Sequence, residues 1–231
     1  MNAGVDWDCV GAELDAHGCA HVPALLDATQ CAAYVAGYGE AARYRSRVLM
    51  ERHGFGRGEY QYFAYPLPAP LQALRTALYP PLAAIANRWD AQLGAGGLRY
   101  PDQLQDYLAR CHAAGQCRPT PLILRYGEGD YNCLHQDLYG EHHFPLQVAV
   151  LLSRPGTDFT GGEFVLTEQR ARMQSRVEVV ALAQGDAVIF PVNQRPLQGA
   201  RGVARATMRH GVSRLRGGQR HTLGIIFHDA N

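Results

Sequence analysis

The feature that most constrains the fold of this chain is a change of sequence texture at Pro119. From there onward, short runs rich in β-branched and aromatic residues alternate with turns that contain glycine or proline. Six runs have this character: Leu122–Tyr126, Leu146–Leu152, Glu163–Leu166, Val177–Leu182, Ala187–Phe190 and His221–Phe227. Strands this short and this regularly interrupted are typical of an antiparallel sandwich or barrel.

The first half of the chain has mainly helical spacing of its apolar residues. We expect helices at residues 5–17, at 28–42 after an Asp27 cap, over 71–93 with a break at Pro80-Pro81, and from an Asp102 cap to 114. Residues 43–65 alternate and predict additional strands around a mobile glycine-rich loop at 53–58. The prediction is one α+β domain over residues 1–231. Within it, 1–118 would supply mainly helical support and lid segments, packed outside one sheet, and 119–229 the β-rich core.

Composition excludes several classes of protein. With 47% hydrophobic and 19% charged residues among 231, the chain can bury a core and is not globally disordered. No apolar run reaches the ~18 residues that span a bilayer, so we expect no integral membrane protein. The first thirty residues carry five acids and no Arg, which does not fit a secretory signal. We therefore expect a cytoplasmic protein whose six cysteines are reduced thiols; the sequence leaves the oligomeric state open.

The basic residues have an unusual composition and distribution. All 22 are Arg, so neither a lysine Schiff base nor a lysine general base can operate here. Residues 170–220 hold ten Arg against only Glu178 and Asp186. A surface this basic fits either a phosphate-bearing partner or an ordinary solvated face.

A His-x-Asp pair carries the strongest chemical signal. His135 and Asp137 lie two residues apart in a strand-like segment, so both side chains can point to one metal ion. His210, expected just after a loop, is the candidate third ligand. Two histidines and one carboxylate form the facial triad of non-haem Fe(II) oxygenases, which leaves coordination positions open.

Arg220 follows His210 by ten residues and opens a predicted strand. Its guanidinium offers a planar fork of donors that matches a carboxylate. Thr222 lies on the same face of this strand and can add a hydroxyl.

In this order, His135, Asp137, His210 and Arg220 resemble the pattern of the Fe(II)/2-oxoglutarate-dependent dioxygenases, in particular a bacterial subgroup of the prolyl-4-hydroxylase-like group. Thr160–Phe164 and Gly185–Phe190 resemble further strands of that family. The resemblance implies a double-stranded β-helix, or jelly roll. It also implies Fe(II) at the triad, 2-oxoglutarate on Arg220 with Thr222, and ascorbate as reductant. The activity implied is hydroxylation coupled to decarboxylation of 2-oxoglutarate to succinate.

A narrower similarity links Arg125–Asp137 to the dioxygenases that repair alkylated nucleobases. In those enzymes a Tyr nine residues before the first ligand touches 2-oxoglutarate, which implies the same role for Tyr126. The chain departs from them at Ile226, where they carry a second Arg. It departs from the hydroxylases at Leu151, where they usually carry a Tyr.

Alternatives remain open at the level of sequence. Gly129, His135, Asp137 and Glu141 loosely match a cupin motif, which would make the chain a metal protein without 2-oxoglutarate. The Arg-rich stretch would alternatively serve a nucleic-acid-binding module. For the substrate we favour a small molecule or a peptidyl residue over nucleic acid. The proposed lid residues are Arg57, Glu59, Tyr60 and Tyr62.

Overall fold

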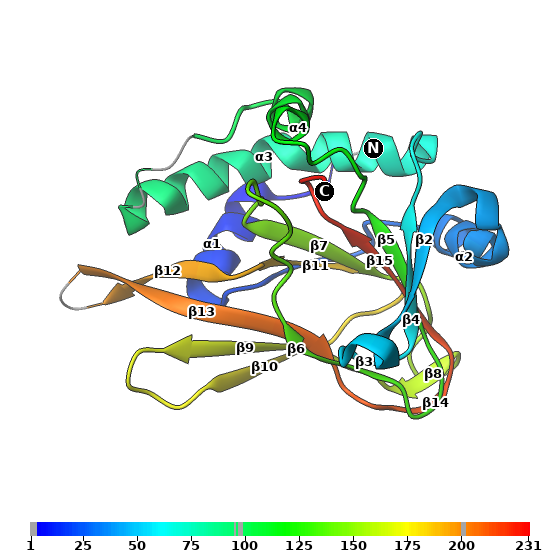
Figure 1. The fold of residues 1–231 in the computed structure, drawn as a ribbon. Coiled ribbons are helices and arrows are strands. Elements are labelled where there is room, and N and C mark those ends of the chain that lie inside the picture. Colours follow the sequence, from blue (N-terminus) through cyan, green and yellow to red (C-terminus); the bar gives the residue numbers. More distant parts are fainter. Residues whose placement is uncertain (1–3, 95, 97–98, 200–201) are drawn as a thin grey trace.

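Two antiparallel sheets face each other in the computed structural model, which describes residues 4–94, 96, 99–199 and 202–231 (Figure 1). The larger sheet has the order β1 (Ala20–Val22), β11 (Ala187–Pro191), β7 (Leu146–Leu151), β15 (Arg220–Ile225), β5 (Leu122–Tyr126), β4 (Glu59–Phe63) and β2 (Tyr44–Leu49). The smaller sheet has the order β10 (Arg176–Val180), β9 (Phe164–Arg170), β13 (Gly202–Val212), β6 (Tyr131–His135) and β3 (Gly56–Arg57). In addition, β12 (Gln194–Gly199) pairs with β13, and β8 (Phe159–Gly161) pairs with β14 (Leu215–Gly218). This arrangement confirms the predicted jelly roll.

The helices cover the outer face of the larger sheet. They are α1 (Trp7–His17), α2 (Ala28–Ala36), α3 (Ala69–Leu93) and α4 (Leu104–Ala113), with short 3₁₀ turns η1 (Gly37–Gly39), η2 (Ala41–Arg43) and η3 (Met50–His53). Figure 1 shows α3 and α4 crossing above this sheet. Leu71, Leu78 and Leu82 of α3 pack in one buried cluster with Val148 and Leu223 of the sheet, as expected for helices against one sheet. None of the described helices has the length and apolarity needed to cross a membrane.

Three helical predictions were wrong in detail. The helix expected over 28–42 ends at Ala36 and is followed by the 3₁₀ turns η1 and η2. The long helix runs without a break through Pro80 and Pro81. Each proline removes one backbone hydrogen bond, but the flanking Tyr79 and Leu82 are fully buried, so tertiary packing holds the helix together. Asp102 does not cap α4: Gln103 occupies the cap position without a side-chain bond, and Asp102 pairs with Arg99 instead.

The segment before His210 is strand and not the expected loop. Gly202–Val212 forms β13, and its C-terminal end pairs with β6 on one side and β9 on the other. The first four residues of β13 are exposed, so they lack the alternation of apolar and polar residues that identifies a strand in sequence. His210 therefore lies on rigid sheet, flanked by two partner strands.

Candidate metal centre

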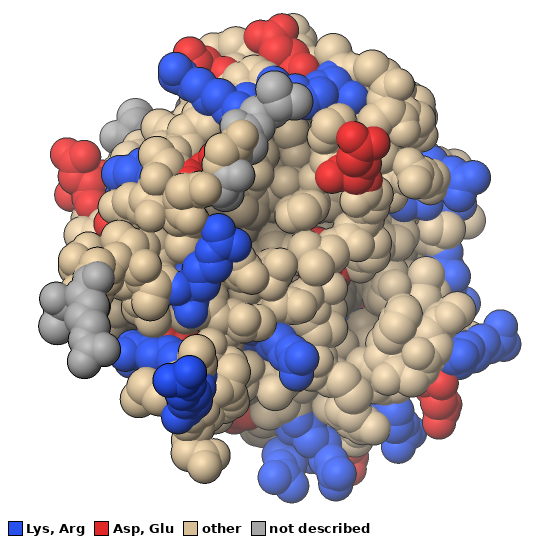
Figure 2. Space-filling view, turned by 60° about the vertical axis from the view of Figure 1, so that its left-hand side comes forward, with Lys and Arg blue, Asp and Glu red and all other residues tan. Residues whose placement is uncertain are grey.

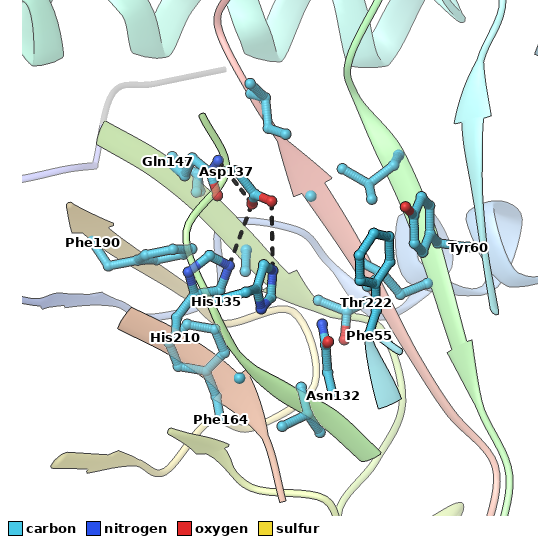
Figure 3. Close-up of a pocket in the computed structure, with 18 of the residues that line it drawn as sticks. Phe55, Tyr60, Asn132, His135, Asp137, Gln147, Phe164, Phe190, His210 and Thr222 are labelled. Atoms are coloured by element: carbon cyan, nitrogen blue, oxygen red, sulfur yellow. Dashed lines mark hydrogen bonds and ion pairs between the residues drawn. The ribbon is translucent and has the colours of Figure 1, made fainter. Parts of the chain in front are cut away.

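The structure brings His135, Asp137 and His210 together at one end of the smaller sheet. His135 ends β6, His210 lies directly opposite it on β13, and Asp137 follows β6 by two residues. Their potential ligand atoms all lie within 4.8 Å of one another. One oxygen of Asp137 is 3.5 Å from Nε2 of His135, and the other is 3.4 Å from Nε2 of His210 (Figure 3).

Neighbouring groups fix the orientation of these side chains. Nδ1 of His135 lies 2.8 Å from the carbonyl oxygen of Cys133, which leaves Nε2 free to bind a metal. Tyr139 donates its hydroxyl proton to Asp137 at 2.8 Å, and Gln147 donates to the other carboxylate oxygen at 3.0 Å. Sequence reasoning missed both partners. Tyr139 could have been found from its position two residues after Asp137. No local pattern points to Gln147, which comes from β7 in the opposite sheet.

The charges of Asp137 and His210 match those of a metal site. Burial opposes ionisation of Asp137, but hydrogen bonds with His135 and His210 hold its pKa well below the usual value. Burial lowers the pKa of His210, while contact with Asp137 raises the pKa of His135 despite burial. An ionised carboxylate beside a neutral buried imidazole is the state that binds a divalent cation.

The residues present fit iron. Asp137 and His210 are buried, and together with His135 they border a cavity of about 200 Å³ between the two sheets. Two imidazoles and one carboxylate that face an open space form the ligand set of non-haem Fe(II). The aromatic residues that line this cavity are Phe55, Tyr60, Tyr62, Tyr126, Tyr139, Phe164 and Phe190.

Arg220, Tyr126 and Thr222 all border the same cavity. Arg220 on β15 pairs in register with Tyr126 on β5, and its Nη1 donates to Oγ1 of Thr222 at 2.6 Å. Arg220 is only 2% exposed, and no carboxylate among the described residues forms an ion pair with it. Burial lowers its pKa to about 10, so the guanidinium stays charged at neutral pH.

Two buried polar atoms, one in Arg220 itself and one in its neighbour Tyr126, are without partners among the described residues. Nε of Arg220 and the hydroxyl of Tyr126 form no hydrogen bond among the described residues. Burial raises the pKa of Tyr126, so its hydroxyl keeps a proton to donate. A buried cation with unsatisfied donors is the environment that a carboxylate ligand would complete.

Of the predicted lid residues, Arg57 lies on β3, and the other three divide between the two faces of β4. Tyr60 and Tyr62 line the cavity, but they belong to the larger sheet and not to a loop. Glu59 points the other way and pairs with Arg47 and Arg125. The glycine-rich segment 53–58 contains β3, which pairs with β6.

Among the described arginines of the 170–220 stretch, Arg220 alone lines the cavity. Arg170, Arg176 and Arg195 converge on the buried carboxylate of Glu168. Arg205 donates to the carbonyl oxygen of Leu93 near the end of α3, and Arg201 lies outside the described residues. Figure 2 shows basic side chains spread singly or in small groups over one face of the molecule.

Comparison with known proteins identifies the family of this chain. Residues 58–230 match the model of the Oxygenase-NA family, described as "oxygenase, catalysing oxidative methylation of damaged DNA". The chain belongs to the Oxygenase-NA family.

Relatives and solved structures agree with this membership. The uncharacterized proteins MT2286 and Rv2227, from two strains of Mycobacterium tuberculosis, are each 48% identical to this Oxygenase-NA protein over 195 residues, or 83% of either chain. A Pseudomonas putida prolyl-4-hydroxylase aligns with a TM-score of 0.56 at 16% identity, over 98% of this chain and 100% of that one. An oxidoreductase of the 2OG-Fe(II) oxygenase family from Burkholderia pseudomallei aligns with a TM-score of 0.53 at 19% identity, over 100% and 96%.

The expected class of enzyme is confirmed. The fold is that of 2-oxoglutarate-dependent oxygenases, and the family is one of oxygenases. This Oxygenase-NA protein is therefore an oxygenase, an oxidoreductase.

Proposed function

We propose that His135, Asp137 and His210 hold Fe(II), and that Arg220, with the hydroxyls of Thr222 and Tyr126, binds the far carboxylate of 2-oxoglutarate. The observation that carries this proposal is the buried, unpaired Arg220 in the same cavity as the triad. A permanent cation there is destabilising unless an anion joins it.

Each residue has a defined task in this proposal. The triad presents two imidazole nitrogens and one carboxylate on one side of the metal, and Tyr139 and Gln147 keep that carboxylate in place. The apolar walls exclude water from the cavity. Iron and 2-oxoglutarate, when bound, supply the chemistry, in which 2-oxoglutarate is decarboxylated to succinate while oxygen enters a substrate C–H bond. Ascorbate as reductant stays part of the proposal.

For the substrate, we propose a methylated nucleobase in damaged DNA. The family description supports nucleic acid over the small molecules and peptides that the sequence favoured. The seven aromatic side chains that line the cavity support a flat group, because aromatic rings can stack on the face of a base. The likeness to prolyl hydroxylases concerns the fold alone.

The chemistry balances for removal of an N-methyl group. Oxygen inserted into a methyl C–H bond gives an N-hydroxymethyl group, which releases formaldehyde and leaves N–H. One molecule each of methylated base, oxygen and 2-oxoglutarate then gives the free base, formaldehyde, succinate and carbon dioxide.

The test is turnover of a short single-stranded oligonucleotide methylated with dimethyl sulfate. With Fe(II) and 2-oxoglutarate, we expect succinate and formaldehyde to form together, and the unmethylated oligonucleotide to give neither above background. Succinate without formaldehyde, stimulated equally by both oligonucleotides, would contradict demethylation. A proline-containing peptide that stimulates succinate release more strongly would contradict the substrate class.

A further inference from the structure

An exposed aromatic side chain stands at the edge of the cavity. Phe55 lines the cavity and is nevertheless 48% exposed. Figure 3 shows it across the pocket from Phe164 and Phe190. Its ring stacks on that of His53, with centroids 5.3 Å apart and planes inclined by 22°. One face of Phe55 is thus supported by a second ring.

The backbone holds Phe55 firmly against the strand that carries His135. The N–H of Phe55 donates to the carbonyl of Met50 at 3.1 Å, and its carbonyl accepts from Cys133 at 2.9 Å. Gly56 has φ of 128°, and a Cβ there would stand 2.4 Å from the carbonyl oxygen of Tyr131. Only glycine permits this close approach, which fixes the position of Phe55 beside the triad.

Two exposed arginines flank this aromatic pair. Along the chain, Arg52 precedes and Arg57 follows His53 and Phe55, and Glu51 is the one acid among residues 50–58. Arg57 lies 3.8 Å from Asp130 with about half of its side chain exposed. Arg52 forms no ion pair with the described part of the chain. Basic and aromatic side chains that alternate on one surface are typical of proteins that bind single-stranded nucleic acid.

We propose that the segment Arg52–Arg57 is a nucleotide-binding surface at the mouth of the active site. Phe55, supported by His53, stacks on a base, while Arg52 and Arg57 neutralise the neighbouring phosphates. The proposal rests on the proposed function, whose substrate it places on a defined surface. It assigns strand binding to this segment and not to the arginines at 170–220, several of which are occupied by Glu168.

The experiment measures binding by fluorescence anisotropy, with metal-free protein and a fluorescein-labelled oligothymidylate. Phe55→Ala should weaken binding by roughly 5- to 100-fold, the range for one base stacked on one aromatic ring. Phe55→Trp should restore it. Met173→Ala is the matched control, because Met173 is a 60% exposed apolar side chain on the β9–β10 turn, outside the cavity lining.

Salt dependence tests the arginines. A plot of log affinity against log salt has a negative slope. Arg52→Ala and Arg57→Ala should each make that slope shallower by about 0.7, the value for one phosphate contact on a single strand. Arg99→Ala should leave the slope unchanged, since Arg99 is an exposed arginine in the connection before α4.

The outcomes separate this proposal from the proposed function. If Phe55→Ala binds the oligonucleotide as tightly as the wild-type protein does and still releases formaldehyde from methylated oligonucleotide, the binding surface is overturned and the function is left intact. If Phe55→Ala weakens binding while the wild-type protein releases no formaldehyde from methylated oligonucleotide, the surface is supported and the function is contradicted. A salt slope that falls equally in Arg99→Ala overturns the role of Arg52 and Arg57.

Discussion

His135 and His210 face each other directly across two neighbouring strands, with ring centroids 4.2 Å apart. The pairing of β6 with β13 sets this separation, so it does not depend on a flexible loop. Asp137 completes the cluster from the segment that follows β6. A metal site built on paired strands is well preorganised, because backbone hydrogen bonds fix the position of each ligand before the metal arrives.

The first prediction concerns the distal ligand. His210→Ala should lower the affinity for Fe(II) by more than the roughly 10- to 100-fold that follows loss of an orienting partner, because a direct ligand is removed. The measurement is anaerobic titration with Fe(II), and His17→Ala on α1 is an exposed control. Full iron occupancy in His210→Ala would place the distal ligand elsewhere.

The second prediction concerns the groups that hold Asp137. Gln147→Leu and Tyr139→Phe each remove one hydrogen bond to its carboxylate. Each change should weaken Fe(II) binding by roughly 10- to 100-fold while the protein stays folded. Fe(II) binding as tight as that of the wild-type protein in both Gln147→Leu and Tyr139→Phe would argue against this account.

More of the candidate site than of the fold could be predicted from the sequence. The spacing of His135 and Asp137 was enough to place two side chains on one face, and the bounds of β5 were predicted as observed. Gln147 could not be predicted as a partner of Asp137, because that contact joins opposite sheets and leaves no local pattern. Phe55 was missed because an exposed aromatic in a glycine-rich segment shows no periodicity.

The third prediction is a loss of stability in mild acid. His228 is fully buried and accepts a hydrogen bond at Nδ1 from the N–H of Phe144, 3.1 Å away. Burial lowers its pKa to about 3, whereas an unfolded His has a pKa near 6.5. The stability that depends on neutral, buried His228 is therefore complete above pH ~6.5 and is lost as the pH falls toward 3. The free energy of unfolding should be lower by roughly 2 kcal/mol at pH 5.

Urea unfolding at two pH values measures this effect. The free energy of unfolding of the wild-type protein should fall between pH 7 and pH 5. It should fall less in His228→Asn, whose side-chain oxygen can accept the same backbone bond without titrating. His17→Asn should behave as the wild type does. An equal fall in wild-type and His228→Asn protein would assign the acid sensitivity to another group, with His221 next, since burial lowers its pKa to about 4.

The most direct test of the central claim is calorimetric titration of 2-oxoglutarate into protein loaded with Mn(II), which replaces Fe(II) without oxidation. We predict one binding site that requires the metal. Arg220→Ala should weaken it by roughly 30- to 5000-fold, the range for a buried charge that loses its partner. Arg220→Lys keeps the charge without the planar fork, so its affinity for 2-oxoglutarate should lie between those of the wild-type protein and Arg220→Ala. Arg214→Ala and Arg216→Ala, exposed neighbours, should bind as the wild type does. Undiminished binding by Arg220→Ala, or equal binding with and without metal, would contradict the account.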